Sequence, residues 1–196
     1  EKDYHHSELH IMESCLTQSQ SSNVFEYIKQ IAGLSNLKNE ETGEKLLSKK
    51  FDKISFVGSD VALAKYLNPS SLQGKRTERE YIPIFPFGCN NSQYKAVKNA
   101  MENQISVIQG PPGTGKTQTI LNIIANILMQ GKTVQIVSNN NSATENVYEK
   151  LYSPKYNLGF IAATLGSSKN KKLFVEHQDA AYPDFSSWKT QEDPSV

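Results

Sequence analysis

The chain of 196 residues is poor in cysteine, nearly neutral in charge and free of long apolar runs. Its two cysteines, Cys15 and Cys89, form no CxxC pair, which favours two free thiols in a reducing compartment over a disulfide. With 21 basic and 20 acidic side chains, the net charge of +1 does not by itself indicate a nucleic-acid partner, although it does not exclude a local basic groove. No apolar stretch approaches the roughly 18 residues of a membrane span, and no signal peptide is visible. We therefore expect a soluble, cytoplasmic protein without a membrane partner.

The strongest motif is residues 110–117, where Gly-Pro-Pro-Gly-Thr-Gly-Lys-Thr fits G-x-x-x-x-G-K-[ST], the phosphate-binding P-loop. Glycines let the backbone curl so that several N–H groups point inward and bind an anion. Lys116 would reach the β- and γ-phosphates, the Thr117 hydroxyl would bind Mg²⁺, and both would serve catalysis. The helix that follows would direct its positive dipole end at the phosphates. The predicted nucleotide-binding residues in and beside the loop are Gly110, Pro111, Pro112, Gly113, Thr114, Gly115, Lys116, Thr117 and Gln118.

The residues around the loop have the β-α-β pattern that a P-loop requires. Residues 105–108 are short, apolar and largely β-branched, which predicts a buried strand. Apolar residues recur at helical spacing over 120–128, Gly131 follows as a helix stop, and 133–137 are predicted to form the next strand. The fold class predicted is α/β of the P-loop NTPase type, with a partial parallel sheet flanked by helices.

Shorter elements are predicted elsewhere in the chain. They are a helix over 25–32, a strand over 51–57, a helix over 60–67, a helix before the loop strand capped by Asn91 or Ser92, a helix starting at the capping box 142–145, and a third strand over 160–165.

Two clusters of charged or titratable residues are better explained as solvated side chains than as ligand sites. His5, His6 and His10 lie near the start, where nothing indicates a fold that would fix metal ligands. Lys169, Lys171 and Lys172 could bind phosphate, but no aromatic residues alternate with them, which favours a solvated loop.

Three segments together resemble superfamily 1 helicases, in the form of the up-frameshift-like branch. Asn91-Ser92-Gln93 followed by Ala96-Val97 is similar to the Q motif that precedes the P-loop in that family. Residues 109–117 resemble its Walker A motif, and 137–147, with Ser138-Asn139, resemble motif Ia. The resemblance covers about residues 85–166.

This resemblance implies ATP and Mg²⁺ as cofactors and single-stranded DNA or RNA as the partner. Gln93 would bond the adenine edge, because an amide offers both a donor and an acceptor. Ser138 and Asn139 would contact the backbone of one nucleic-acid strand, with ordinary turn formation as the alternative. Asn140 stands where the family more often has a small or apolar residue.

The resemblance also suggests how the chain is divided. Residues 1–80 would be a separate N-terminal segment, mostly α or α+β, of unknown role. Residues 81–166 would be the first part of a RecA-like ATPase domain. Residues 167–196 would be a polar tail that begins an insertion, where Tyr182, Phe185 and Trp188 are better explained by packing than by base stacking.

The 196 residues lack groups that a P-loop motor needs for hydrolysis. Such a motor needs a Walker B Asp-Glu after a strand and an arginine finger. Glu176 follows three apolar residues, but His177 replaces the second acid, and no arginine follows Arg79. Because the chain also begins without Met, we expect a fragment that by itself hydrolyses ATP very slowly.

The sequence therefore favours the ATP-binding part of an ATP-dependent DNA or RNA helicase or translocase. A P-loop ATPase that does not unwind nucleic acid, such as an AAA-type remodeller or a signalling ATPase, is the first alternative. A non-catalytic nucleotide-binding scaffold is the second.

Overall fold

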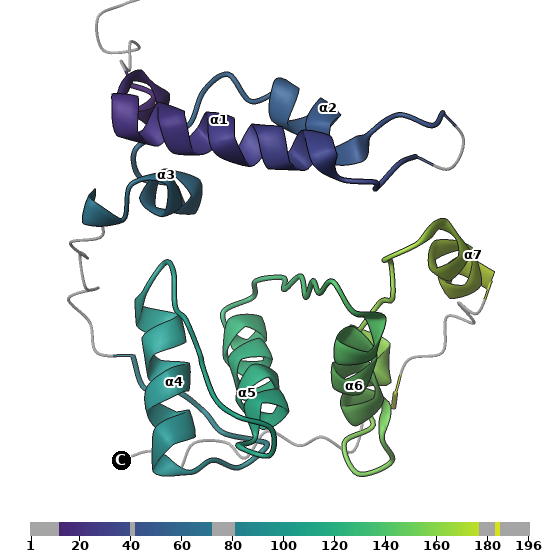
Figure 1. Ribbon diagram of the computed structural model, residues 1–196. Helices are drawn as coiled ribbons and strands as arrows, with labels where there is room; N and C mark the ends of the chain where they lie inside the picture. Colours follow the sequence, from purple (N-terminus) through teal and green to yellow (C-terminus); the bar gives the residue numbers. More distant parts are fainter. Residues whose placement is uncertain (1–11, 40–41, 72–80, 177–182, 185–196) are drawn as a thin grey trace, which may run out of the picture. The chain divides into compact units, whose positions relative to one another are not determined.

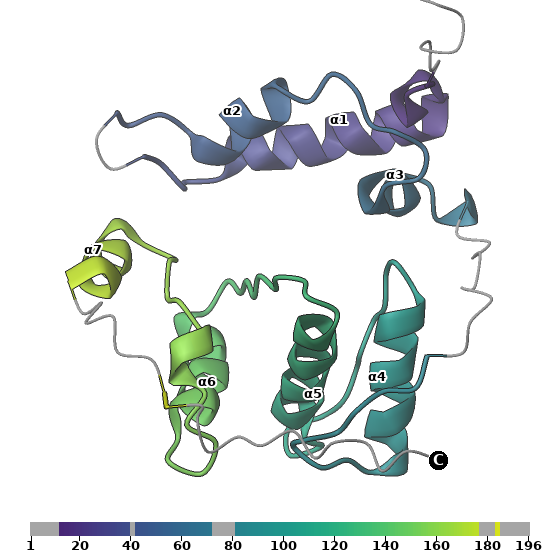
Figure 2. The same ribbon diagram turned by 180° about the vertical axis from the view of Figure 1, so that it is seen from behind.

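The computed structural model describes residues 12–39, 42–71, 81–176 and 183–184. The histidines near the start and the three aromatic residues of the tail lie outside the described residues. The chain divides into two compact units, Glu1–Tyr81 with Glu102–Val107, and Ile82–Met101 with Ile108–Val196. We call them the N-terminal unit and the P-loop unit, and Figures 1 and 2 show the helices of each from opposite sides.

The regular elements of the N-terminal unit are helices and 3₁₀ turns in the part that the structure describes. Its elements are a 3₁₀ turn η2 (Cys15–Thr17), the helices α1 (Ser19–Leu34), α2 (Leu46–Asp52) and α3 (Ala62–Leu67), and a 3₁₀ turn η3 (Pro69–Ser71). Helices α2 and α3 both pack against α1 (Figure 1). The helices predicted over 25–32 and 60–67 are confirmed as α1 and α3.

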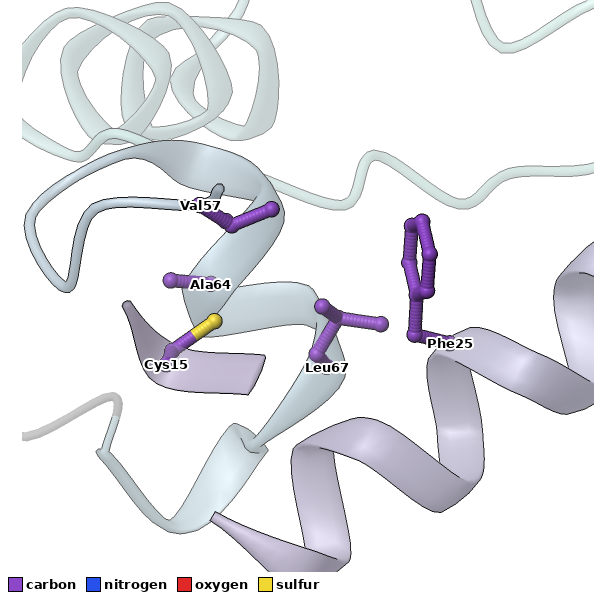
Figure 3. Packing of buried hydrophobic residues seen from close by; sticks show 5 residues of the cluster. All are labelled: Cys15, Phe25, Val57, Ala64 and Leu67. Carbon is purple, nitrogen blue, oxygen red and sulfur yellow. The ribbon is translucent and has the colours of Figure 1, made fainter. Parts of the chain in front are cut away.

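An apolar core joins η2, α1 and α3. Its buried members are Cys15, Phe25, Val57, Ala64 and Leu67. Figure 3 shows Leu67 of α3 directed toward α1, where Phe25 lies, and Cys15 beside Ala64. Leu67 has no exposed surface. The elements around it are short and bury few residues each, so this core depends on the contacts between them.

The strand predicted over 51–57 is wrong, because its first residues belong to helix α2. Phe51 packs its ring on Phe25 of α1, with 5.8 Å between ring centroids. Lys29 Nζ of α1 forms an ion pair with Asp52 Oδ1 at 3.0 Å. The hydrogen bond from Lys29 to this carboxylate raises the pKa of Lys29. Contacts with α1 thus favour the helical turn over the extended chain that weak alternation had indicated.

The P-loop unit contains three helices that Figures 1 and 2 draw side by side, with α5 between α4 and α6. They are α4 (Asn91–Glu102), α5 (Lys116–Met129) and α6 (Asn141–Tyr152), followed by the 3₁₀ turn η4 (Gly159–Ile161) and helix α7 (Ser168–Glu176). The buried apolar cluster of this unit consists of Phe87, Leu121, Ile124, Val147 and Leu151. It joins α5 and α6 to the segment before α4.

The described residues contain no strand, so the predicted parallel sheet stays a prediction. They contain only two isolated bridges, Ser14 with Gly58 and Lys38 with Lys45. Residues 105–108 and 133–137 have no strand assignment, and Val107 and Val137 are 88% and 77% exposed. A strand requires a hydrogen-bonded neighbour, and neither segment has one among the described residues. The strand predicted over 160–165 is wrong at its start, where η4 forms a 3₁₀ turn.

The caps of two helices differ from those predicted. Helix α4 is capped by Asn90, whose Oδ1 accepts the Gln93 N–H at 2.9 Å, and not by Asn91 or Ser92. Helix α6 is capped by Asn140, whose Oδ1 accepts the Ser142 N–H at 3.1 Å, so the helix begins before the predicted capping box. Asparagine is a strong helix cap wherever its side chain can reach a free N–H group, and the neighbouring Ser and Asn made the position ambiguous from sequence alone.

The ends of α5 and the position of α7 settle two further predictions. Gly131 adopts φ of 69° and its N–H donates to Leu128, so the predicted glycine stop of α5 is confirmed. Helix α7 contains the lysines expected in a solvated loop, and they are exposed on it. It also contains Glu176, so the apolar residues before that carboxylate are helical. Among the described residues, no helix is both long and apolar enough to cross a membrane.

Candidate nucleotide-binding site

The loop before α5 has the backbone that a phosphate cradle needs. Gly113 and Gly115 adopt φ of 86° and 80°, in the left-handed region that favours glycine. Gly115 is the N-cap of α5, so the loop leads directly into the helix N-terminus. A Cβ at Gly115 would lie 2.2 Å from Gln93 Nε2, and one at Gly110 would lie 2.7 Å from Thr114 Oγ1. Gly110 and Gly115 are thus required by close packing, and Gly113 by its backbone conformation alone.

The polar side chains of the loop are held in place by its own backbone. Lys116 is exposed, and its ammonium donates to the carbonyls of Gly110 and Pro111, the latter at 2.8 Å. Thr114 donates its hydroxyl to the same Pro111 carbonyl at 2.8 Å. The two bonds of Lys116 bring the start and the end of the loop together around one cation.

Thr117, the predicted Mg²⁺ ligand, is half-buried in the first turn of α5. Its hydroxyl forms no hydrogen bond with the residues that the structure describes. A hydroxyl oxygen is a hard donor of the kind that Mg²⁺ accepts beside phosphate oxygens and water. In the described part of the chain, no three His, Cys, Asp or Glu side chains gather into a metal-binding cluster.

Gln93 lies beneath the loop, and its side chain is only 6% exposed. Its Nε2 lies within hydrogen-bonding distance of the carbonyls of Thr114 (3.4 Å) and Gly115 (3.2 Å) and of Gln118 Oε1 (3.1 Å). Its Oε1 accepts the Asn90 N–H at 2.8 Å, which completes a reciprocal capping box with Asn90. Gln93 therefore joins the start of α4 to the turn that begins α5.

Further along α5, buried amide side chains bind the backbone of the segment before α4. Asn122 accepts the Phe87 N–H at 3.2 Å and donates to the Gly88 carbonyl at 2.8 Å. Asn126 accepts the Ile84 N–H and donates to the Ile84 carbonyl, both at 2.8 Å. Gln118 donates to the Phe87 carbonyl at 2.5 Å. We call Gln118, Asn122 and Asn126 the amide ladder.

Gln118 is predicted from the sequence as a neighbour of the loop, whereas the two asparagines of the ladder are not. Asn122 and Asn126 have no exposed surface, although they lie in a helix whose apolar periodicity suggested an apolar core face. The signal that could have revealed them is the spacing of polar residues at 118, 122 and 126, one above the other along one face of the helix.

Ser138 and Asn139 lie at the entry to α6, apart from the loop in sequence, and both are exposed. The Ser138 hydroxyl accepts the Asn140 N–H at 3.1 Å. This contact helps to place Asn140 as the cap of α6. The pair therefore precedes a helix N-terminus, a position where backbone N–H groups and the helix dipole favour an anion.

Comparison with known proteins agrees with the motifs of this unit. The model of a family described as an AAA domain matches residues 88–186, half of the chain. The chain is 38% identical over 98 residues, 48% of the chain, to DNA polymerase alpha-associated DNA helicase A of Schizosaccharomyces pombe. It is 38% identical over 87 residues, 44% of the chain, to the Uncharacterized ATP-dependent helicase MG140 homolog of Mycoplasma pneumoniae. It is 42% identical over 64 residues, 32% of the chain, to the Regulator of nonsense transcripts 1 homolog of Drosophila melanogaster.

The similarity covers a small part of each relative: 15%, 8% and 5% of their lengths in the same order. No solved structure shows significant similarity to the chain. The resemblance to superfamily 1 helicases that the motifs indicated is confirmed by these matches.

Proposed function

Because the chain belongs to the AAA-domain family and resembles the ATPase region of superfamily 1 helicases, we propose that it is the ATP-binding part of an ATP-dependent DNA or RNA helicase or translocase. The observation that supports this most directly is the left-handed glycine turn at the N-terminus of α5, with Lys116 bonded across it. Two of these relatives are named as helicases. Their names favour the helicase over a remodeller, a signalling ATPase or a scaffold.

In this proposal residues 110–117 bind the triphosphate of ATP. Lys116 exchanges its bonds to two neutral carbonyls for bonds to the β- and γ-phosphates, in which both partners carry charge. Thr117 holds Mg²⁺ through its hydroxyl. Bound ATP would supply the phosphoryl group: water would attack the γ-phosphorus in line, the bond to the β–γ bridging oxygen would break, and ADP would leave. Lys116 stabilises the charge that develops on the phosphate oxygens.

Gln93 is proposed to contact the adenine base in addition to supporting the loop. A carbonyl oxygen has two lone pairs, and Gln93 Oε1 uses one of them for the Asn90 N–H. The second lone pair can accept an exocyclic amine without breaking the capping box. Gln118 would then assist by holding Gln93 Nε2.

The RecA-like parallel sheet is part of the same proposal. Residues 105–108 lead into the loop and 133–137 follow α5, where strands of a β-α-β unit belong. Their apolar side chains, with Val107 and Val137 strongly exposed, suit strands whose pairing partners the described residues do not include.

Binding of ATP and Mg²⁺, measured by calorimetry, tests the nucleotide site. Lys116→Ala is expected to weaken ATP binding about 100-fold, because two charge-assisted bonds are lost. Lys132→Ala is the matched control, since Lys132 is exposed just beyond the other end of α5. Equal ATP affinity of wild type and Lys116→Ala would refute the proposed site.

We also propose that Ser138 and Asn139 bind the backbone of a single nucleic-acid strand at the N-terminus of α6. Such contacts position the strand without reading its bases. Ser138→Ala with Asn139→Ala is expected to weaken binding of oligo(dT) or oligo(U) severalfold while ATP binding is kept. If single-stranded nucleic acid neither binds the chain nor stimulates the ATPase of the longer protein, the remodeller or signalling alternative gains.

Hydrolysis by the 196 residues alone is proposed to be very slow. No arginine follows Arg79, and Glu176 lies within α7 instead of ending a strand. We propose that the acidic pair and the arginine finger are supplied by a longer polypeptide or a second chain. Rapid ATP turnover by these residues, abolished by Lys116→Ala, would contradict this part of the proposal.

A further inference from the structure

The segment before α4 is attached to the loop helix by amide side chains as well as by the apolar contacts of Phe87. Residues 84–88 include Pro86 and contain a turn in which the Gly88 N–H donates to the Phe85 carbonyl at 3.0 Å. Proline has no N–H, so such a segment is a poor central strand and cannot rely on a full ladder of backbone bonds. The amide ladder of α5 provides bonds to this backbone instead.

The geometry of the ladder matches the segment at two points. Asn126 binds both the N–H and the carbonyl of Ile84, as a residue on a neighbouring antiparallel strand would. Asn122, one turn earlier, binds the N–H of Phe87 and the carbonyl of Gly88. The two asparagines are about 6 Å apart along the helix axis, whereas three extended residues span about 10 Å. The turn at Phe85–Gly88 shortens the segment so that both anchors are reached.

The ladder continues to Gln93, the residue predicted to contact the base. Gln118 binds the Phe87 carbonyl through its Nε2 and Gln93 through its Oε1. Gln93 in turn binds the Gly115 carbonyl and the Asn90 N–H. The segment, the cap of α4 and the loop turn are therefore connected by one chain of hydrogen bonds that starts at Asn126.

We propose that Asn122 and Asn126 are positioning residues of the nucleotide site: they fix the register of residues 84–88 on α5 and so hold Gln93 at the correct distance from the phosphate-binding loop. In this proposal they act through Gln93 and touch no ligand themselves. This inference rests on the proposed binding of ATP, because it assigns the ladder to the base side of the same site. It predicts that the asparagines matter for binding the base and little for binding the phosphates.

Two ligands separate these contributions: ATP, and inorganic tripolyphosphate, which has the phosphates but no base. Asn122→Ser is expected to weaken ATP binding about tenfold, the size expected for one or two lost hydrogen bonds, and to change tripolyphosphate binding less than about twofold. Leu121→Ala is the matched control, because Leu121 is the buried apolar neighbour on the same helix. It should lower stability while leaving the ratio of the two affinities unchanged.

If Asn122→Ser weakened the binding of ATP and of tripolyphosphate in equal proportion, the inference would be overturned. The asparagine would then act only through stability, as Leu121 is expected to do. Amide hydrogen exchange of the wild type gives an independent test that needs no variant. The N–H groups of Ile84 and Phe87 should be the slowest to exchange within residues 82–90, and fast exchange of both would also overturn it. If the wild type bound neither ligand, the proposed function would fail while the exchange experiment still tested the ladder.

Discussion

The two units of this protein bury different kinds of side chain where their short segments meet. In the N-terminal unit, η2, α1 and α3 meet through Cys15, Phe25, Val57, Ala64 and Leu67. In the P-loop unit, α5 meets residues 84–88 partly through Asn122 and Asn126, which are as fully buried as Leu67. Apolar contacts are non-directional and tolerate small shifts, whereas amide bonds require one register. In the unit that carries the loop, the amide bonds therefore fix the register between α5 and residues 84–88.

The largest expected effect concerns the apolar core of the N-terminal unit. Leu67→Ala should lower the free energy of unfolding of that unit by about 3 kcal/mol, because it removes a fully buried side chain and leaves a cavity. Leu34→Ala is the control, since Leu34 is 80% exposed, and its effect should stay within about 0.5 kcal/mol. Urea unfolding measures both variants. An equal loss in the two would show that this core is not what stabilises the unit.

The contribution of the buried amides to stability is tested by replacing one of them with an apolar side chain. Asn126→Leu should lower the free energy of unfolding of the P-loop unit by about 2–3 kcal/mol, because the N–H and the carbonyl of Ile84 lose their partner. Ile124→Leu, an apolar exchange of equal volume in the same helix, should cost less than about 1.5 kcal/mol. Thermal unfolding followed by circular dichroism compares the two. A stabilising Asn126→Leu would mean that the ladder is not needed for folding.

A smaller effect is expected at the glycines. Gly115→Ala should cost about 1–2 kcal/mol from its left-handed backbone, and its new methyl group would also displace Gln93. Gly33→Ala in α1 should instead stabilise by about 0.4–1 kcal/mol, because no atom lies within 4 Å of the added Cβ. Chemical unfolding of both variants should give opposite signs, and the same sign would contradict this account of the loop.

The smallest effect is expected for the ion pair of α1 and α2. Both partners are partly exposed, so Asp52→Asn should change stability little. The pKa of Lys29 is raised by Asp52, so the contribution of the pair is present below the ordinary lysine pKa of 10.5 and is lost as the pH rises through the raised value. The difference between wild type and Asp52→Asn should therefore shrink as the pH rises above the ordinary lysine pKa of 10.5. A stability difference that grows with pH would contradict a raised pKa of Lys29.

Local sequence patterns were enough to predict the loop, the helix that follows it with its glycine stop, and the resemblance to helicases. These depend on local chemistry: glycines that allow a left-handed turn, a lysine and a threonine at fixed offsets, and a glycine stop. The tertiary structure decided what periodicity could not. Contacts with α1 made residues 46–52 a helix, and Asn90 and Asn140 became the caps because their side chains reach free N–H groups.

The burial of Asn122 and Asn126 was also decided only in three dimensions. Apolar periodicity ranks asparagine as a surface residue. Residues 84–88 have no strand partner among the described residues, and their backbone offers the asparagines hydrogen bonds that make burial favourable. Sequence patterns state which side chains avoid water. They do not state which distant backbone groups will satisfy a buried amide, because that depends on how segments separated by some 40 residues along the chain come together.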